Sequence, residues 1–182
     1  GVEVVKVLTS MAIPTNVTTC FTLPQIWAVA KAAKEGLAIA ERNKVDMSKW
    51  RAVITMMIGR LTEHPVLDEQ AARRGITLSW TDKHWLGIHV FRKAHRLLQE
   101  NGMPSKMLAC SMRDGPLTGG RYRFWDVEKI AGAIVYTMPP YVLEPLFQRC
   151  EDLTFREEIW LEDTPKDVLA KLSKIPYVLQ SW

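Results

Sequence analysis

Short apolar runs rich in β-branched residues alternate along the chain with longer runs of helical character. Four of the short runs, residues 17–22, 51–58, 107–112 and 133–138, predict strands. Each is nearly all apolar, which is typical of parallel strands covered by helices. Pro139 and Pro140 are expected to stop the fourth strand.

The longer runs predict helices with recognisable ends. One begins at Pro24, and a second extends from about residue 82 to 101, with Gly102 just past its end. A short helix is expected over residues 126–132, with Asp126 as its N-cap. The run from about 164 to 173 starts with TPKD, an N-cap residue followed by proline in the first turn.

This alternation predicts an α/β protein with a parallel sheet, either an open doubly wound sheet or a (β/α)₈ barrel. Neither the dinucleotide pattern G-x-G-x-x-G nor the phosphate loop G-x-x-x-x-G-K-[ST] occurs. Four strand–helix units make half of such a barrel. Nothing in the pattern divides the chain, so residues 1–182 are expected to form one domain.

Composition and charge narrow the classes of function. The 182 residues are 47% apolar and 24% charged, which excludes a disordered chain, and no apolar run reaches the roughly 18 residues of a membrane span. The net charge of +4 is spread along the chain without a basic block, which disfavours a nucleic-acid partner.

Cys20, Cys110 and Cys150 are odd in number and form no C-x-x-C pair. Buried, reduced thiols in a cytoplasmic protein are therefore expected rather than a disulfide framework. No signal-peptide pattern follows Gly1. No metal site or cofactor is expected either.

Polar residues at the strands could carry chemistry, because function collects at the carboxyl ends of parallel strands. The candidates are Asn16, Thr18, Thr55, Arg60, Ser111 and Arg113. Two strands finish in an arginine, and two guanidinium forks beside a hydroxyl would suit a phosphate group. Alternatively, each arginine caps a carbonyl or pairs with a surface acid, and the sequence leaves the two interpretations about even.

Three ordered motifs, PTNVTTCFTLPQ, ITMMIGR and MLACSMRD, resemble the second half of transaldolase. The resemblance implies a (β/α)₈ TIM barrel of which this chain supplies about strands 5–8 and their helices. It also implies transfer of a dihydroxyacetone unit between sugar phosphates, in the pentose phosphate pathway, through a Schiff base on a lysine.

The family's roles carry over to matching positions. Asn16 and Thr18 match the pair that holds substrate hydroxyls and the catalytic water, and Thr55 stands where serine is usual. Arg60, Ser111 and Arg113 match the phosphate site. Met56 and Met57 replace Pro-Phe, and Met112 replaces an aromatic residue, so donor and acceptor preference is open.

The Schiff-base lysine is a larger departure. The run around Lys6 has strand-like composition, but only nine residues separate Lys6 from Asn16, and a parallel crossover usually needs about a dozen or more. This segment instead resembles the family's crossover helix, which places the reactive lysine before Gly1. The missing half-barrel is then expected from the same gene product, a second chain or self-association.

Other residues are given structural interpretations. His84, His89 and His95 lie on one predicted helix at spacings of five and six, unlike a helical metal pair, and are expected to be solvated or capping. His64 is expected to be inert, and Trp27 and Trp50 to pack in the core or at its rim. Trp85 is a candidate oligomer contact, and GPLTGG a flexible connection or a phosphate cover.

Three functions stay open. The first is a transaldolase-type transferase, inactive as this chain alone. The second is a non-catalytic half-barrel that binds phosphate or serves assembly, and the third is a related lysine-dependent sugar-phosphate aldolase.

Overall fold

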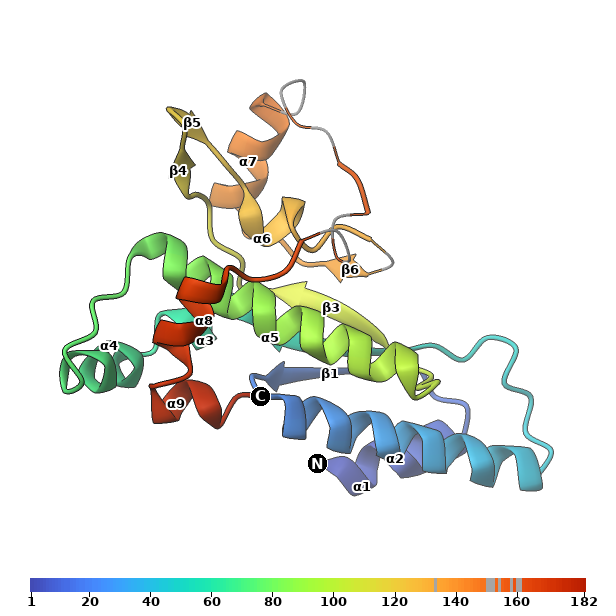
Figure 1. The fold of residues 1–182 in the computed structure, drawn as a ribbon. Helices are drawn as coiled ribbons and strands as arrows, with labels where there is room; N and C mark the ends of the chain where they lie inside the picture. Colours follow the sequence, from blue (N-terminus) through green and yellow to red (C-terminus); the bar gives the residue numbers. More distant parts are fainter. Residues whose placement is uncertain (133, 150–152, 154, 158, 160–161) are drawn as a thin grey trace.

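A parallel four-stranded sheet forms the centre of the molecule. The computed structural model describes residues 1–132, 134–149, 153, 155–157, 159 and 162–182. The strands are β1 (Thr15–Cys20), β2 (Ala52–Met57), β3 (Lys106–Cys110) and β6 (Val135–Tyr136), adjacent in that order and all parallel (Figure 1). The predicted parallel α/β class is confirmed, and strand order follows chain order.

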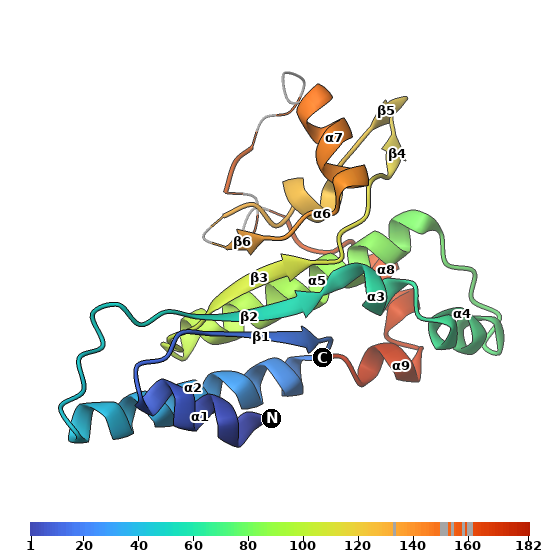
Figure 2. The same cartoon turned by 180° about the vertical axis from the view of Figure 1, so that it is seen from behind.

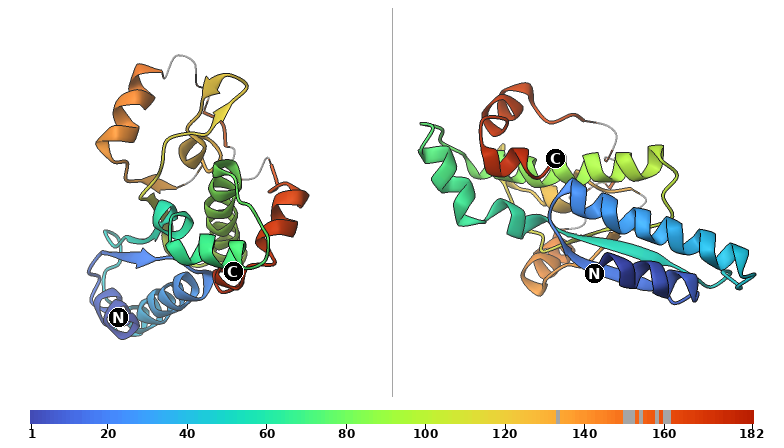
Figure 3. Two further views of the ribbon diagram at one scale, coloured as in Figure 1. Left: turned by 90° about the vertical axis from the view of Figure 1, so that its left-hand side faces the viewer. Right: turned by 90° about the horizontal axis from the view of Figure 1, so that it is seen from below.

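Helices cover one face of this sheet. The long helices α2 (Leu23–Arg42) and α5 (Trp80–Glu100) lie along it, and α1 (Val2–Ser10) packs beside α2 (Figure 3). In Figure 2 the strands lie in front of α5, and among the described residues no helix crosses the near face of β1 and β2. We call this second side the open face, because no described helix covers β1 and β2 there; Asn16 and Thr18 are exposed on it, whereas Thr55 is buried.

Side chains alternate between these two faces, as strand geometry requires. Val17, Ile54 and Met107 point into the helix layer, where Ile54 and Met107 are almost wholly buried. Trp50 is buried in the core as predicted. Trp85 is also in the core, with the ring of Trp125 5.4 Å away between centroids, so the alternative that it is an oligomer contact is wrong.

Capping residues fix the starts of the two long helices. Thr22 caps α2 in a reciprocal pair with Gln25, with Pro24 in the first turn. Ser79 and Asp82 make the equivalent pair at α5, which begins at Trp80, two residues before its predicted start. These boxes satisfy amide groups that a helix start leaves unpaired.

Two predicted caps are wrong. Asp126 lies inside α6 (Trp125–Glu128), after Phe124, because its carboxylate bonds to groups from other elements instead. The carboxyl-terminal helix α8 (Lys166–Leu172) has Pro165 at its N-cap position, and Thr164 contacts His89 on α5.

Several elements were absent from the sequence prediction. They are the helices α3 (Ile58–Thr62), α4 (Pro65–Ala72), α7 (Pro140–Gln148) and α9 (Pro176–Leu179), and the strands β4 (Leu117–Thr118) and β5 (Arg121–Tyr122). Gly59 therefore belongs to a helical turn and does not close a strand. GPLTGG belongs to the β4–β5 hairpin, in which Gly119 and Gly120 adopt the positive φ of a tight turn; whether it is flexible or covers a phosphate stays open.

The cysteines fit the expectation of buried thiols in part. Cys20 is buried, which raises the pKa of its thiol, and Cys110 is half-buried. Cys150 lies outside the described residues, as does Ala133 at the start of the fourth predicted strand. In the described part of the chain, no helix combines the length and apolar character needed to cross a bilayer.

Candidate active site at the carboxyl ends of the strands

The first part of the site lies on the open face of β1 and β2. Asn16 and Thr18 are both exposed there, and Thr55 of the neighbouring strand is 3% exposed. The Thr55 hydroxyl donates to Asn16 Oδ1 at 2.6 Å. Met57 continues this face, with its sulfur 3.9 Å from the Thr18 hydroxyl. The three hydroxyl and amide groups predicted from the motifs therefore share one surface.

The close approach of two chain segments forms the second part. Gly59 donates its N–H to the Ser111 carbonyl at 2.9 Å, which joins the segment after β2 to the segment after β3. A Cβ on residue 59 would lie 2.1 Å from that carbonyl oxygen and 2.8 Å from Arg113 Cζ. Only glycine allows this approach, so Gly59 lets the segments that follow β2 and β3 lie side by side.

Arg113 is held firmly by its surroundings. Its Nη1 donates to the Ser111 carbonyl at 2.8 Å and lies 3.3 Å from the Ser111 hydroxyl. Nε and Nη2 bind the two carboxylate oxygens of Glu63. The hydrogen bond to Glu63 raises the pKa of the guanidinium. Of the two open interpretations of this arginine, pairing with an acid and a carbonyl is the one that the structure contains.

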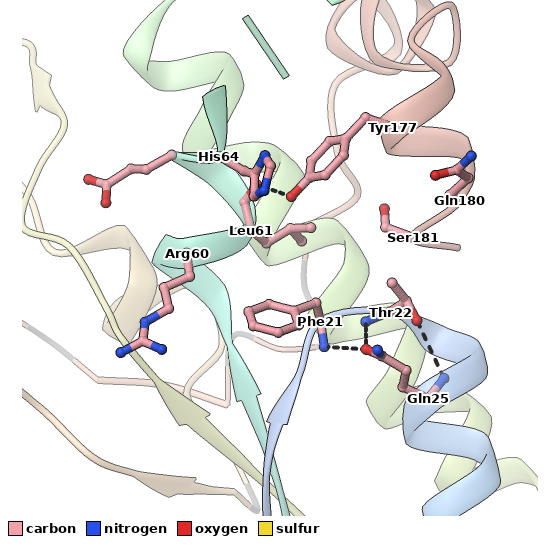
Figure 4. Close-up of a pocket in the computed structure, with 10 residues that line it drawn as sticks. Phe21, Thr22, Gln25, Arg60, Leu61, His64, Tyr177, Gln180 and Ser181 are labelled. Atoms are coloured by element: carbon pink, nitrogen blue, oxygen red, sulfur yellow. Dashed lines mark hydrogen bonds between the residues drawn. The ribbon is translucent and has the colours of Figure 1, made fainter. Parts of the chain in front are cut away.

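Arg60 differs from Arg113 in this respect. It is exposed on α3 and, within the described residues, makes no hydrogen bond or ion pair. Its side chain lines a cavity of about 620 Å³ (Figure 4). A guanidinium with free donors beside an open cavity is suited to bind an anion.

The cavity walls come from elements distant in sequence. Phe21 and Gln25 come from the end of β1 and the start of α2, and Tyr177 comes from α9 (Figure 4). The Tyr177 hydroxyl donates to the Leu61 carbonyl at 3.0 Å, and its ring stacks on His64 at 5.3 Å between centroids. These contacts fix α9 against α3 and close one side of the cavity.

Several of these wall residues were missed in the sequence. His64 caps α4 through Nδ1 and lines the cavity, and its expected chemical inertness stays a prediction. Gln25 stands in one of the quoted motifs and could have been found there. Glu63 and Tyr177 carry no signal in the sequence, because their places depend on tertiary packing.

A buried hydrogen-bonded pair, His84 and Asp126, lies next to the backbone of Arg113. Asp126 accepts from the Arg113 backbone N–H at 2.8 Å and from His84 Nδ1 at 2.8 Å. The side chains of His84 and Asp126 are each 2% exposed. His95 is buried as well, and burial lowers its pKa. The predicted solvated histidines are therefore wrong for His84 and His95, because α5 lies in the core.

Lys6 lies outside the site. It belongs to α1, which confirms the helical interpretation of that segment, and its Nζ is 3.4 Å from Glu35 of α2. It therefore sits between helices rather than among Asn16, Thr18 and Thr55 on the open face.

Asn16, Thr18 and Thr55 lie along one face of the strands, while Arg60 and Arg113 follow the carboxyl ends of β2 and β3, the edge at which parallel α/β proteins usually bind ligands. Residues 1–180 match the family model for transaldolase/fructose-6-phosphate aldolase. The chain belongs to this family, which is a family of TIM-barrel enzymes, and the motif resemblance is confirmed. No curated protein matches the sequence of this chain.

Proposed function

We propose that the chain supplies half of a (β/α)₈ barrel, about strands 5–8, which transfers a dihydroxyacetone unit between sugar phosphates. In this proposal the donor ketone forms a Schiff base with a lysine that lies outside these 182 residues. The supporting observation is the Thr55–Asn16 hydrogen bond between β1 and β2, on the open face of the sheet in which β2 leads to Arg60 and β3 leads to Arg113.

Each residue then has a defined role. Asn16 and Thr18 orient the substrate hydroxyls and the water that forms and hydrolyses the imine, and Thr55 fixes the Asn16 amide through its hydrogen bond. Arg60 binds the phosphate from the cavity side, with Ser111 and Arg113 opposite. None of these groups can form an imine, so the amine must come from a lysine.

The open surfaces support the need for a second half. Among the described residues, β1 and β6 each have a neighbour on one side only, and Asn16 and Thr18 are exposed. Helix α1 also exposes Val2, Val4 and Val7. Such edges and apolar positions are usually covered. The covering half comes from the same gene product, a second chain or another copy.

Borohydride trapping tests this function. The assembled enzyme is incubated with fructose 6-phosphate, reduced with borohydride, and mapped by peptide mass spectrometry. A reduced dihydroxyacetone adduct is expected on a lysine outside residues 1–182, unchanged in Lys6→Met and reduced in Arg60→Ala. Absence of any adduct, or an adduct on Lys6, would contradict the proposal.

A second candidate is an aldolase that releases free dihydroxyacetone rather than transferring it. Met57 favours it, because its side chain stands next to Thr18 on the substrate face and alters the pocket that receives the acceptor. Enzymatic assay of free dihydroxyacetone, with and without an acceptor aldehyde phosphate, separates the two. Release without acceptor identifies the aldolase.

A third candidate is a half-barrel that binds phosphate or serves assembly without catalysis. The guanidinium of Arg60 beside the cavity is the observation in its favour, because it can bind an anion without any imine-forming amine. It predicts stabilisation by phosphate without any borohydride adduct.

A further inference from the structure

The carboxylate of Glu63 occupies the part of Arg113 that an anion would use. Arg113 Nε is 2.7 Å from Glu63 Oε1, and Nη2 is 2.5 Å from Oε2. This is the parallel two-bond geometry that guanidinium groups form equally with carboxylates and with phosphates. Glu63 therefore stands in the position of a ligand anion.

The remaining donor of the fork is also engaged. Nη1 of Arg113 contacts the Ser111 carbonyl at 2.8 Å and the Tyr141 hydroxyl at 3.1 Å. Ser111 and Tyr141 therefore hold Nη1 in place, while Glu63 occupies Nε and Nη2. Phosphate can reach Nε and Nη2 only if the Glu63 carboxylate leaves.

Glu63 is placed so that it can leave. It follows α3 directly, its side chain is 40% exposed, and it lines the cavity that Arg60 also lines. Its pKa is lowered, first by the hydrogen bond from Arg113 and further by the nearby charge of Lys83, so the carboxylate is ionised at neutral pH.

We propose that Glu63 is an internal anion that sets the specificity of the phosphate site. In the ligand-free protein it neutralises Arg113, and a substrate phosphate takes its place while Glu63 turns into the cavity. A phosphomonoester carries two charges near neutral pH and can displace one carboxylate. A sugar acid carries a single carboxylate and gains little by the exchange. The identity of the anion as a sugar phosphate rests on the proposed function.

Calorimetric titration with inorganic phosphate and with acetate tests this proposal. The variants are Glu63→Gln and, as a control of equal charge change, Glu69→Gln, an exposed residue on α4. A partly exposed ion pair such as Glu63–Arg113 is weak, so removal of the competing Glu63 carboxylate is expected to tighten phosphate binding about five-fold. Acetate binding should improve at least as much, which lowers selectivity, and Glu69→Gln should change either affinity less than two-fold.

Glu63→Asp provides a second variant in case Glu63→Gln disturbs folding, because a shorter carboxylate holds Arg113 less well and should give an intermediate gain. Unchanged or weaker phosphate binding in Glu63→Gln, with normal binding in the wild type, would overturn this inference and leave the proposed function intact. An equal gain in Glu69→Gln would reduce the effect to net charge and overturn it too. No phosphate binding in any form would overturn both.

Discussion

The substitution Gly59→Ala tests how the ends of β2 and β3 are joined. The added Cβ would meet the Ser111 carbonyl oxygen at 2.1 Å and Arg113 Cζ at 2.8 Å. A carbonyl oxygen is part of the backbone, so it cannot rotate away as a side chain could. The two segments must therefore separate, and Arg113 must move with them.

The magnitude follows from three contributions. Adding a methyl group to a filled site costs about 1–3 kcal/mol. Loss of the 2.9 Å hydrogen bond between Gly59 and Ser111 adds about 1 kcal/mol. Alanine regains at most about 1 kcal/mol through its helix propensity in α3. We expect the free energy of unfolding to fall by about 2 kcal/mol, and Tm by about 4–8 °C.

Urea unfolding followed by far-UV circular dichroism measures the free energy, and phosphate titration measures the site. Gly119→Ala is the matched control, because it replaces a glycine in the β4–β5 turn where an added Cβ meets nothing within 4 Å. It should cost about 1 kcal/mol through its positive φ and leave phosphate affinity unchanged. A Gly59→Ala protein as stable as wild type, with normal phosphate affinity, would refute the reasoning.

Three further predictions address other parts of the molecule. Burial lowers the pKa of His89 to about 4, below its ordinary 6.5, so the unfolded chain binds the extra proton between these values. The free energy of unfolding should therefore fall as pH is lowered from about 6.5 to 4, and His89→Gln should flatten that urea-midpoint profile. Asp126→Asn should lower the free energy of unfolding by about 1–3 kcal/mol in urea, and it should also weaken phosphate binding because Asp126 holds the Arg113 backbone. Unchanged phosphate affinity would show that Asp126 contributes to folding alone. Thr55→Val keeps shape but removes the donor to Asn16, so Tm should change little while kcat falls about ten-fold or more with KM nearly constant; a change in KM alone would contradict the assigned role.

The strand positions could be predicted because burial against helices requires apolar side chains. Their ends could not. The predicted strand 51–58 stops at Met57, where the chain turns into α3, and that turn depends on the contact between Gly59 and Ser111. The first strand ends earlier than predicted, after Thr19 adopts a positive φ. Helix α7 carries Pro145 within it, against the local rule that proline interrupts a helix.

The candidate site could be predicted as far as the motifs reached. Asn16, Thr18 and Thr55 share a face, and Ser111 contacts Arg113, as expected. Local sequence contains no information on which acid faces an arginine 50 residues away, so the Glu63–Arg113 pair was not predicted. The burial of His84 was hidden for the same reason, because its partner Asp126 lies on another element.

A crystal structure of the assembled enzyme with fructose 6-phosphate tests the central claim most directly. The account predicts the phosphate between Arg60 and Arg113, with the sugar extending over the open face toward Asn16 and Thr55. A phosphate bound elsewhere, with both arginines arranged as in the ligand-free protein, would contradict it.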